Sequence, residues 1–515
     1  MGSDLPAKIG RNLVRGTVGT AAGRMVEAVI GLVMVPFILG HLGSELYGLW
    51  ALLYAMISYL NLADMGLSAG LNRHFTAALT SGNQREQEEV LTTALLLMGG
   101  FALLVGIAGW PIIPLVLRFF PDVAQYGSEA VWTFRALVIT FALSYLANYG
   151  RSLLVSTHHA ARMAALQIVI SLGNAAVIVF VLLMGWGLIG LALGTTAFTV
   201  VRLLVYFIAG IHAVDRWRFR PHRFSRSVLN KLWSFGMWVQ LTRLSELLNT
   251  HFGRIFVGRV MGMSSVTHFD LGMKAAQSSG LLSHMVVYVI EPAAAALHEL
   301  KDRERFRRLL FDAGRFMGLS AFGMAAFVIA VAPELLVLWL EDIPDPNVVS
   351  ALRLLSIALV LEAVTLPMRL VARGAGRPQW SAQYGLLHAG LNVLLSIGGY
   401  MQWGFIGILI GHVIASWVGY GLQTGVTLKG LRQPVGRFFL STWAAPLAVT
   451  IPAAVLLRWA LHAWGPSLEQ TGRLEILPWV LGCLMVYSVA TVLLAHGSRV
   501  MRFGELRQLL RRLRG

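Results

Sequence analysis

Four charged residues interrupt apolar stretches of membrane length in this chain. Arg24 and Glu27 lie within the run from Gly23 to Trp50, and Arg243 and Glu246 lie within a later run. A charged side chain at the centre of a bilayer costs about 3 kcal/mol even on a lenient insertion scale, so it usually faces a bundle interior or a wet cavity. These residues can therefore neutralise each other as internal ion pairs, or they can line a path for a substrate or an ion.

The later run is the most polar of the apolar stretches. Asn249 and Arg254 join Arg243 and Glu246 there, and at about 100 degrees per residue the four side chains spread over a broad helix face. A helix this polar cannot contact lipid on that side, so we expect this face to line a water-accessible cavity.

Three more charged residues lie in apolar surroundings. Asp64 follows the first run, and Asp270 and Lys274 follow the later one. Asp270 and Lys274 are four residues apart, a spacing that allows them to pair with each other on a helix. Catalytic patterns are absent from the sequence, which has no phosphate-binding GxxxxGK[ST] loop and no HExxH zinc motif. Its single cysteine, Cys483, provides no disulfide or thiolate metal site, so we expect no metal, no cofactor and no enzymatic activity.

The charged motif belongs to an internal repeat. Arg-x-x-Glu at residues 24–27 returns at residues 243–246, a shift of 219 positions. The segment WGLIGLALG at residues 186–194 returns as WGFIGILIG at residues 403–411, a shift of 217 positions. Such repeats are typical of transporters with a central site between two halves.

Composition indicates a membrane protein. The chain is 56% hydrophobic and only 13% charged, whereas a soluble domain carries about 25% charged residues. Its net charge of +17 does not indicate nucleic-acid binding, because the basic residues lie in short connections between apolar runs and no soluble domain is left to carry them on one face. This distribution is the one expected of cytoplasmic loops.

The apolar runs predict an all-α polytopic membrane protein with about fourteen transmembrane helices. We expect a six-helix bundle over residues 1–215, a basic cytoplasmic linker over 216–231, a second six-helix bundle over 232–428, and a terminal helix pair with a basic cytoplasmic tail over 429–515. An even number of spans in each repeat makes the two halves parallel repeats. Arginine clusters follow the even-numbered spans, which places both termini in the cytoplasm. The main alternative is twelve spans and a mistaken terminal pair.

Several segments together resemble the polysaccharide transporter (Wzx-type) family. They are Val35-Pro36, Leu42-Gly43, Tyr47-Gly-Leu-Trp50, Tyr59-Leu-Asn-Leu-Ala-Asp-Met-Gly-Leu67 and the paired WG(L/F)IG segments. This family shares a superfamily with the MATE drug exporters and the lipid II flippases. The resemblance implies two V-shaped six-helix bundles around a cationic cavity. It also implies movement of undecaprenyl-diphosphate-linked oligosaccharide across the bacterial inner membrane by alternating access, for the assembly of a surface polysaccharide.

The resemblance also implies roles for the charged residues. It assigns contact with the diphosphate or with acidic sugars to Arg24, Arg243, Arg254, Lys274 and Asn249. It assigns charge balance or proton coupling to Glu27, Asp64, Glu246 and Asp270. Many relatives carry Asp-Arg where this chain has Gly253-Arg254, so a role of that acid does not transfer.

The resemblance makes the lipid-linked oligosaccharide and the bilayer the partners, with a polymerase and glycosyltransferases as further ones, and a monomer as the expected state. Three alternatives remain open: an ion-coupled MATE-like drug exporter, a lipid II flippase, and a scaffold of a polysaccharide synthase complex that transports nothing. The abundance of arginine argues against a cationic drug as the substrate.

Overall fold

Helices form the regular structure of the residues that the computed structural model describes. These are residues 5–64, 66–215, 217–234, 237–280, 303–342, 344–374, 378–465 and 473–497, and no strand occurs among them. The chain divides into two compact units, Met1–Thr267 and His268–Gly515. The domain limits expected from the sequence remain a prediction, but α8, which the sequence assigns to the second bundle, lies in the first unit.

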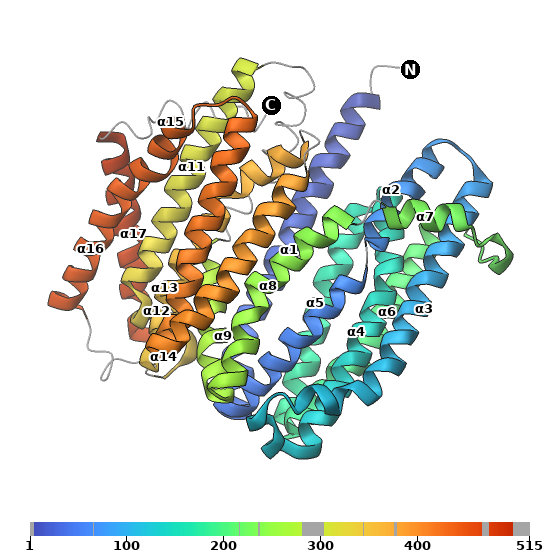
Figure 1. Ribbon diagram of the computed structural model, residues 1–515, viewed down its shortest axis with the longest axis horizontal. Helices are drawn as coiled ribbons and strands as arrows, with labels where there is room; N and C mark the ends of the chain where they lie inside the picture. Colours follow the sequence, from blue (N-terminus) through green and yellow to red (C-terminus); the bar gives the residue numbers. More distant parts are fainter. Residues whose placement is uncertain are drawn as a thin grey trace. The chain divides into compact units, whose positions relative to one another are not determined.

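The first unit contains a kinked helix followed by a bundle (Figure 1). Its α-helices are α1 (Leu5–Ser58), α2 (Leu67–Thr80), α3 (Gln84–Leu117), α4 (Gly127–Ser156), α5 (Ala160–Leu183), α6 (Gly187–His212), α7 (Arg226–Ser234) and α8 (Met237–Val260). Short 3-10 turns join them at η1 (Tyr59–Asp64), η2 (Pro121–Tyr126) and η3 (Pro221–Arg223). Helix α9 (Met263–Ser278) crosses the boundary between the units.

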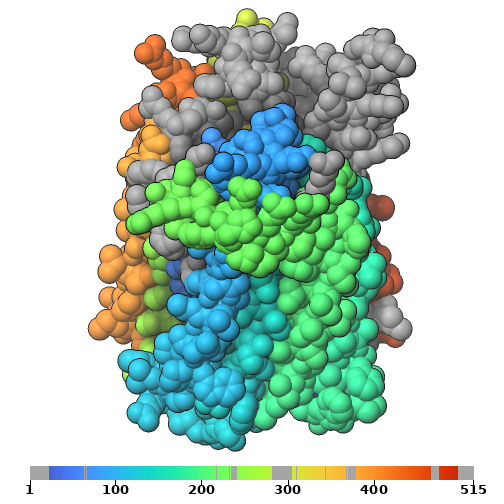
Figure 2. All heavy atoms as spheres, turned by 90° about the vertical axis from the view of Figure 1, so that its right-hand side faces the viewer, coloured from blue at the N-terminus to red at the C-terminus, as the bar shows by residue number. Residues whose placement is uncertain are grey.

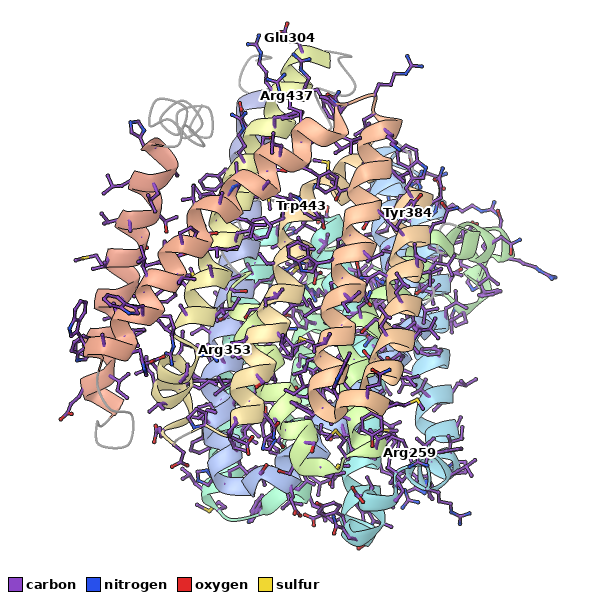
Figure 3. All side chains as sticks on the ribbon, turned by 60° about the vertical axis from the view of Figure 1, so that its left-hand side comes forward. Arg259, Glu304, Arg353, Tyr384, Arg437 and Trp443 are labelled. Carbon is purple, nitrogen blue, oxygen red and sulfur yellow. The ribbon has the colours of Figure 1, made fainter. Side chains whose placement is uncertain are left out.

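The second unit is built from α11 (Arg303–Ala330), α12 (Ala332–Leu340), α13 (Pro346–Gly374), α14 (Pro378–Gly430), α15 (Val435–Phe439), the π-helical turn η4 (Leu440–Ala444), α16 (Ala445–Trp464) and α17 (Arg473–Gly497). Its core lies where α11, α13, α14 and η4 meet, around Leu361, Ala325 and Trp443. Trp443 is labelled in Figure 3, where it lies among these helices.

Ten segments of the described residues are long and apolar enough to cross a membrane. Two of them, Gly23–Leu62 and Gln379–Gly430, hold 40 and 52 residues, or about 60 and 78 Å of helix, which is at least twice the roughly 30 Å thickness of the hydrocarbon core. Each is long enough to pass twice, so the ten segments of the described residues have the length for twelve passes, with α8 and α9 not counted among them. The chain is thus an all-α, multi-pass membrane protein. The second predicted bundle begins with α8 and α9, which the structure describes. Residues 281–302, which follow them, lie outside the described residues.

The internal repeat recurs in the backbone. Gly43 breaks α1 with a φ of 77°, and Gly262, 219 positions later, has a φ of 88°. Gly187 begins α6 with a φ of 61°, and Gly404, 217 positions later, breaks α14 with a φ of 56°. This left-handed region is open to glycine at little cost and is disfavoured for other residues. A positive φ therefore explains the glycine at each of these four repeated positions.

The second WGxIG segment brings two helices into backbone contact, whereas Gly190 and Gly194 of the first segment lie against side chains of Trp186, Val177 and Val181. A Cβ atom added to Gly407 would lie 1.9 Å from the carbonyl oxygen of Gly399, and one added to Gly411 would lie 2.5 Å from the backbone of Leu395. The two halves of α14 therefore pack with their backbones touching. Small residues at these positions permit this close helix approach.

The basic linker is an ordered part of the first unit. Helix α7 packs across α2 and α3, and Figure 2 shows this segment in green beside the blue residues of α2. Arg220 and Arg223 pair with Glu88 of α3 at 3.3 and 3.6 Å. Backbone amides of Arg220 and Ser225 also donate to hydroxyls at the start of α3. The linker is thus a helix docked onto the unit rather than a free connection.

We expect Gly399→Ala to lower the thermal midpoint of the purified protein, whereas Gly398→Ala leaves it unchanged or raises it. A Cβ at Gly399 would lie 2.2 Å from the oxygen of Gly407, whereas a Cβ at the neighbouring Gly398 meets nothing within 4 Å. Overpacking costs about 1–3 kcal/mol, and an unobstructed Gly→Ala change in a helix gains up to about 1 kcal/mol. The check is a thermal scan in detergent, and equal midpoints for the two variants would contradict the backbone contact.

Candidate functional site

A buried ion pair joins η1 to α8 in the first unit. Arg243 Nη1 lies 2.7 Å from Asp64 Oδ2, and the side chain of Asp64 is only 8% exposed. The other oxygen, Asp64 Oδ1, accepts hydrogen bonds from the Ser68 amide at 3.3 Å and from the Ser68 hydroxyl at 3.1 Å. Gly66, with a φ of 77°, turns the chain so that α2 begins beside this carboxylate. Helix α2 is therefore separate from the membrane-spanning segment that ends at η1.

A second cluster, which we call the Glu27 cluster, gathers Glu27, Arg151, Gln167, Arg202 and Tyr206 from α1, α4, α5 and α6. Gln167 Nε2 donates to Glu27 Oε2 at 2.6 Å. Arg202 lies near enough to Glu27, Arg151 and Tyr206 for electrostatic interaction, and it donates to the Ser144 hydroxyl. Two arginines and one carboxylate leave the cluster with a net positive charge.

The members of the Glu27 cluster lie at similar depths. Arg151 lies five residues before the end of α4, Gln167 seven after the start of α5, and Arg202 ten before the end of α6, distances of roughly 8, 10 and 15 Å along these helices. These three ends lie on one side of the bundle, because α5 returns directly from α4 and α6 returns from α5. The cluster is therefore inside the membrane-spanning segments but close to one face. Glu27 itself is exposed, as is Arg24 three residues before it on the same helix.

The remaining candidate residues of α8 divide between inside and outside. Arg254 is buried, with Nη1 donating to the Thr250 carbonyl at 2.8 Å and lying 3.4 Å from His251 Nδ1. Asn249 is half-buried, whereas Glu246 is exposed. The ring of His251 packs edge-on against Tyr59 of η1. Helix α8 thus contacts η1 through both Arg243 and His251.

Asp270 and Lys274 form the ion pair that their spacing allows. Lys274 Nζ lies 2.8 Å from Asp270 Oδ2 on α9, within the second unit. The carboxylate is 3% exposed and the ammonium group 35% exposed, so the lysine is the member that a solute can reach. This pair needs no further partner to explain its presence in an apolar setting.

The sequence analysis missed Arg151, Gln167 and Arg202. All three are polar residues within apolar runs of membrane length, which is the same signal that identifies Glu27. Asp64 was found but not its partner, because local spacing offers no hint of a pair 179 residues apart. No group of three or more histidine, cysteine or acidic residues suited to a metal ion occurs in the described part of the chain.

The fold is that of known transporters. The lipid II flippase MurJ in an inward closed conformation is similar with a TM-score of 0.70 and 11% identity, over 94% of this chain and 98% of that one. A multidrug resistance MATE family transporter of the MOP superfamily, in its inward-facing conformation, is similar with a TM-score of 0.63 and 19% identity, over 80% of this chain and 95% of that one. At these identities the similarity shows the architecture alone.

Sequence comparison gives the family. A Shigella flexneri protein described as an O-antigen transporter is 19% identical over 361 residues, which is 69% of this chain and 83% of that protein. The model of a family described as polysaccharide biosynthesis protein matches residues 41–342, more than half of the chain, including η1, α8 and most of the Glu27 cluster. With its transporter fold and its intramembrane charges, this chain belongs to the polysaccharide biosynthesis protein family.

Proposed function

We propose that this protein is a flippase that moves an undecaprenyl-diphosphate-linked oligosaccharide across the bacterial cytoplasmic membrane by alternating access. The observation that carries the proposal is the positive charge of the Glu27 cluster, which lies within membrane-spanning segments and in which Arg151 and Arg202 outnumber the single carboxylate of Glu27. In a low-dielectric setting an arginine attracts a diphosphate far more strongly than it does in water, and its planar fork suits phosphate oxygens. Membership of the polysaccharide biosynthesis protein family supports a glycan as part of the cargo.

The position of the cluster fits loading from the cytoplasm. With both termini cytoplasmic, the turn between α4 and α5 faces the cytoplasm, and the cluster lies about 8–15 Å inside that face. A diphosphate that enters from the inner leaflet would meet Arg151 first and Arg202 deeper in the bundle. Arg24 on α1 is a third contact, and Glu27, held by Gln167, limits the net charge so that the substrate can leave again.

The ion pairs are the proposed points of coupling. Protonation of Asp64 would release Arg243 to bind substrate, and loss of the proton would restore the pair, so proton and substrate binding are linked through one arginine. Lys274 with Asp270 is a second pair of this kind.

Arg254 and Asn249 complete the proposed substrate contacts on α8, and Glu246 balances charge at its exposed position. A polysaccharide polymerase and glycosyltransferases are proposed partners of the monomeric transporter.

We expect Arg202→Gln to lower the rate of flipping at least tenfold, because the loss of one charge-assisted contact to phosphate in a desolvated site is worth about 1.5–3 kcal/mol. The assay is translocation of fluorescently tagged undecaprenyl-diphosphate-linked glycan in proteoliposomes, at matched amounts of folded protein. The control is Arg85→Gln, which removes an arginine 75% exposed at the surface of the same unit and should leave the rate unchanged.

Two results of this assay would overturn the proposal. Native protein that exports a cationic dye under an ion gradient but moves no lipid-linked glycan would be a MATE-like exporter. Native protein that flips lipid II in preference to the oligosaccharide-linked lipid would be a lipid II flippase.

We expect Arg243→Gln to destabilise the protein by about 2 kcal/mol, because it leaves the buried Asp64 carboxylate without its cation. The cost is below that of a fully buried pair since Arg243 is about one-third exposed. Adding Asp64→Asn should restore most of the loss, and flipping by Asp64→Asn alone should respond less than wild type to an imposed pH gradient, because Asp270–Lys274 is retained. Thermal scans measure the first effect and proteoliposomes the second. Additive losses in the double variant would show that the pair is not coupled.

Orientation gives a separate prediction. In a Cys483→Ser background, Met184→Cys should react with a membrane-impermeant maleimide in intact cells, because it precedes α6 at the proposed outer face and is 55% exposed. Ser81→Cys, exposed between α2 and α3, should react only after the membrane is permeabilised. The reverse pattern would place the termini outside.

A further inference from the structure

A large apolar cavity lies inside the second unit, and none of the site residues described above is among those that line it. Its volume is about 680 Å³, and α11, α13, α14 and α16 contribute its walls. The wall is almost wholly apolar and includes Phe322, Ile329, Val360, Trp417, Leu447 and Ile451. A cavity of this size suits a small molecule or part of a lipid chain.

Two arginines stand in this apolar wall. Arg353 comes from α13 and Arg458 from α16. Arg353 Nε donates to the Ile329 carbonyl at 3.3 Å, and Arg458 Nη1 donates to Glu334 Oε1 at 2.8 Å. Among the described residues, these contacts fix Arg353 through Nε and leave its two Nη atoms without a protein partner. Because Glu334 neutralises one arginine, the three side chains together carry one positive charge.

The cavity has a charged end and an apolar end. On α13, Ile357 and Val360 follow Arg353 by four and seven residues, so all three lie on one face. On α16, Ile451 and Leu447 precede Arg458 by seven and eleven residues, about 10 and 16 Å of helix. The apolar lining residues follow Arg353 in the sequence of α13 and precede Arg458 in the sequence of α16. In antiparallel helices this order places both arginines at the same end of the cavity.

The charged end lies at the depth of lipid phosphates. Arg353 follows the start of α13 by seven residues, roughly 10 Å, and Arg458 precedes the end of α16 by six, roughly 9 Å. Helix α13, with 29 residues, is about 43 Å long, which spans the hydrocarbon core and both headgroup layers. The arginines are therefore near the boundary between headgroups and hydrocarbon. Figure 3 shows Arg353 well away from Arg437, which marks the opposite end of this unit.

We propose that this cavity is a binding site for an anionic phospholipid of the bilayer, with the phosphate on Arg353 and Arg458 and an acyl chain along α13 and α16. A cation in an apolar wall requires an anion or water, and a soluble anion would gain nothing from the apolar remainder. An anionic lipid satisfies both parts, and basic pockets between transmembrane helices bind lipid headgroups in this way. The bound lipid would hold α16 against α11 and α13. The proposal does not depend on which substrate is transported.

The test compares lipid affinity in variants of the full-length protein purified in a neutral detergent. Phosphatidylglycerol and phosphatidylcholine with the same acyl chains are titrated, and bound lipid is counted by native mass spectrometry. Wild type should bind phosphatidylglycerol more tightly. Arg353→Gln should weaken phosphatidylglycerol binding about tenfold, as the loss of one charged hydrogen bond predicts, and should weaken phosphatidylcholine binding less, because choline neutralises the charge of its phosphate.

Two further variants separate headgroup from chain. Ala454→Phe fills the apolar part of the cavity and should weaken both lipids. Arg437→Gln, an exposed arginine outside the cavity in the same unit, should behave as wild type. Arg458 is left in place because its removal would leave the buried Glu334 without a cation. Equal affinity of wild type for the two lipids, an unchanged Arg353→Gln, or displacement of the lipid by millimolar inorganic phosphate would each overturn the proposal.

Discussion

The cost of placing an ionised group in hydrocarbon governs the arrangement of the polar residues in this protein. A carboxylate within an apolar helix needs a cation or a strong hydrogen-bond donor, because water cannot supply one there. Asp64 has Arg243, Asp270 has Lys274, Glu334 has Arg458, and Glu27 has Gln167 with Arg202 nearby. Three of these four contacts join different helices, so the same requirement that neutralises the charge also fixes how η1, α8, α12, α16, α1 and α5 pack.

Much of the fold follows from the sequence because hydrophobic length is a local signal. Apolar runs locate the helices, whereas the breaks at Gly43 and Gly404, where glycine takes the required φ at little cost, emerge only from the structure. The turn at Gly66 is another such break. The segment beyond Gly66 is apolar enough to continue the membrane-spanning segment that ends at η1. However, the chain turns at Gly66, and this turn places the amide and hydroxyl of Ser68 where they donate to Asp64.

The pairings of the candidate site could not be derived in the same way. Sequence spacing relates residues three or four apart, which correctly indicates Asp270 with Lys274. The same rule sets Arg243 beside Glu246, whereas the structure pairs Arg243 with Asp64 and leaves Glu246 exposed. Contacts between helices distant in the chain depend on how the bundle packs. Arg353 and Arg458, 105 positions apart on two helices, become one charged end of a cavity only when α13 and α16 are assembled.

Fold similarity leaves the substrate open, since MATE exporters and MurJ share this architecture while their names point to drugs and lipid II. Charge balance is the more informative property. A pair such as Asp270 with Lys274 is neutral and is explained by its own stability in the membrane. The Glu27 cluster is different, because Arg151 and Arg202 exceed the single carboxylate beside them, and a surplus of cations is unfavourable in hydrocarbon unless an anion occupies the site during the working cycle. A cationic drug would add to that surplus and a neutral glycan would leave it unrelieved. A diphosphate-linked lipid would relieve it, so the surplus supports the proposed anionic cargo over a cationic drug or a neutral glycan but does not separate it from lipid II.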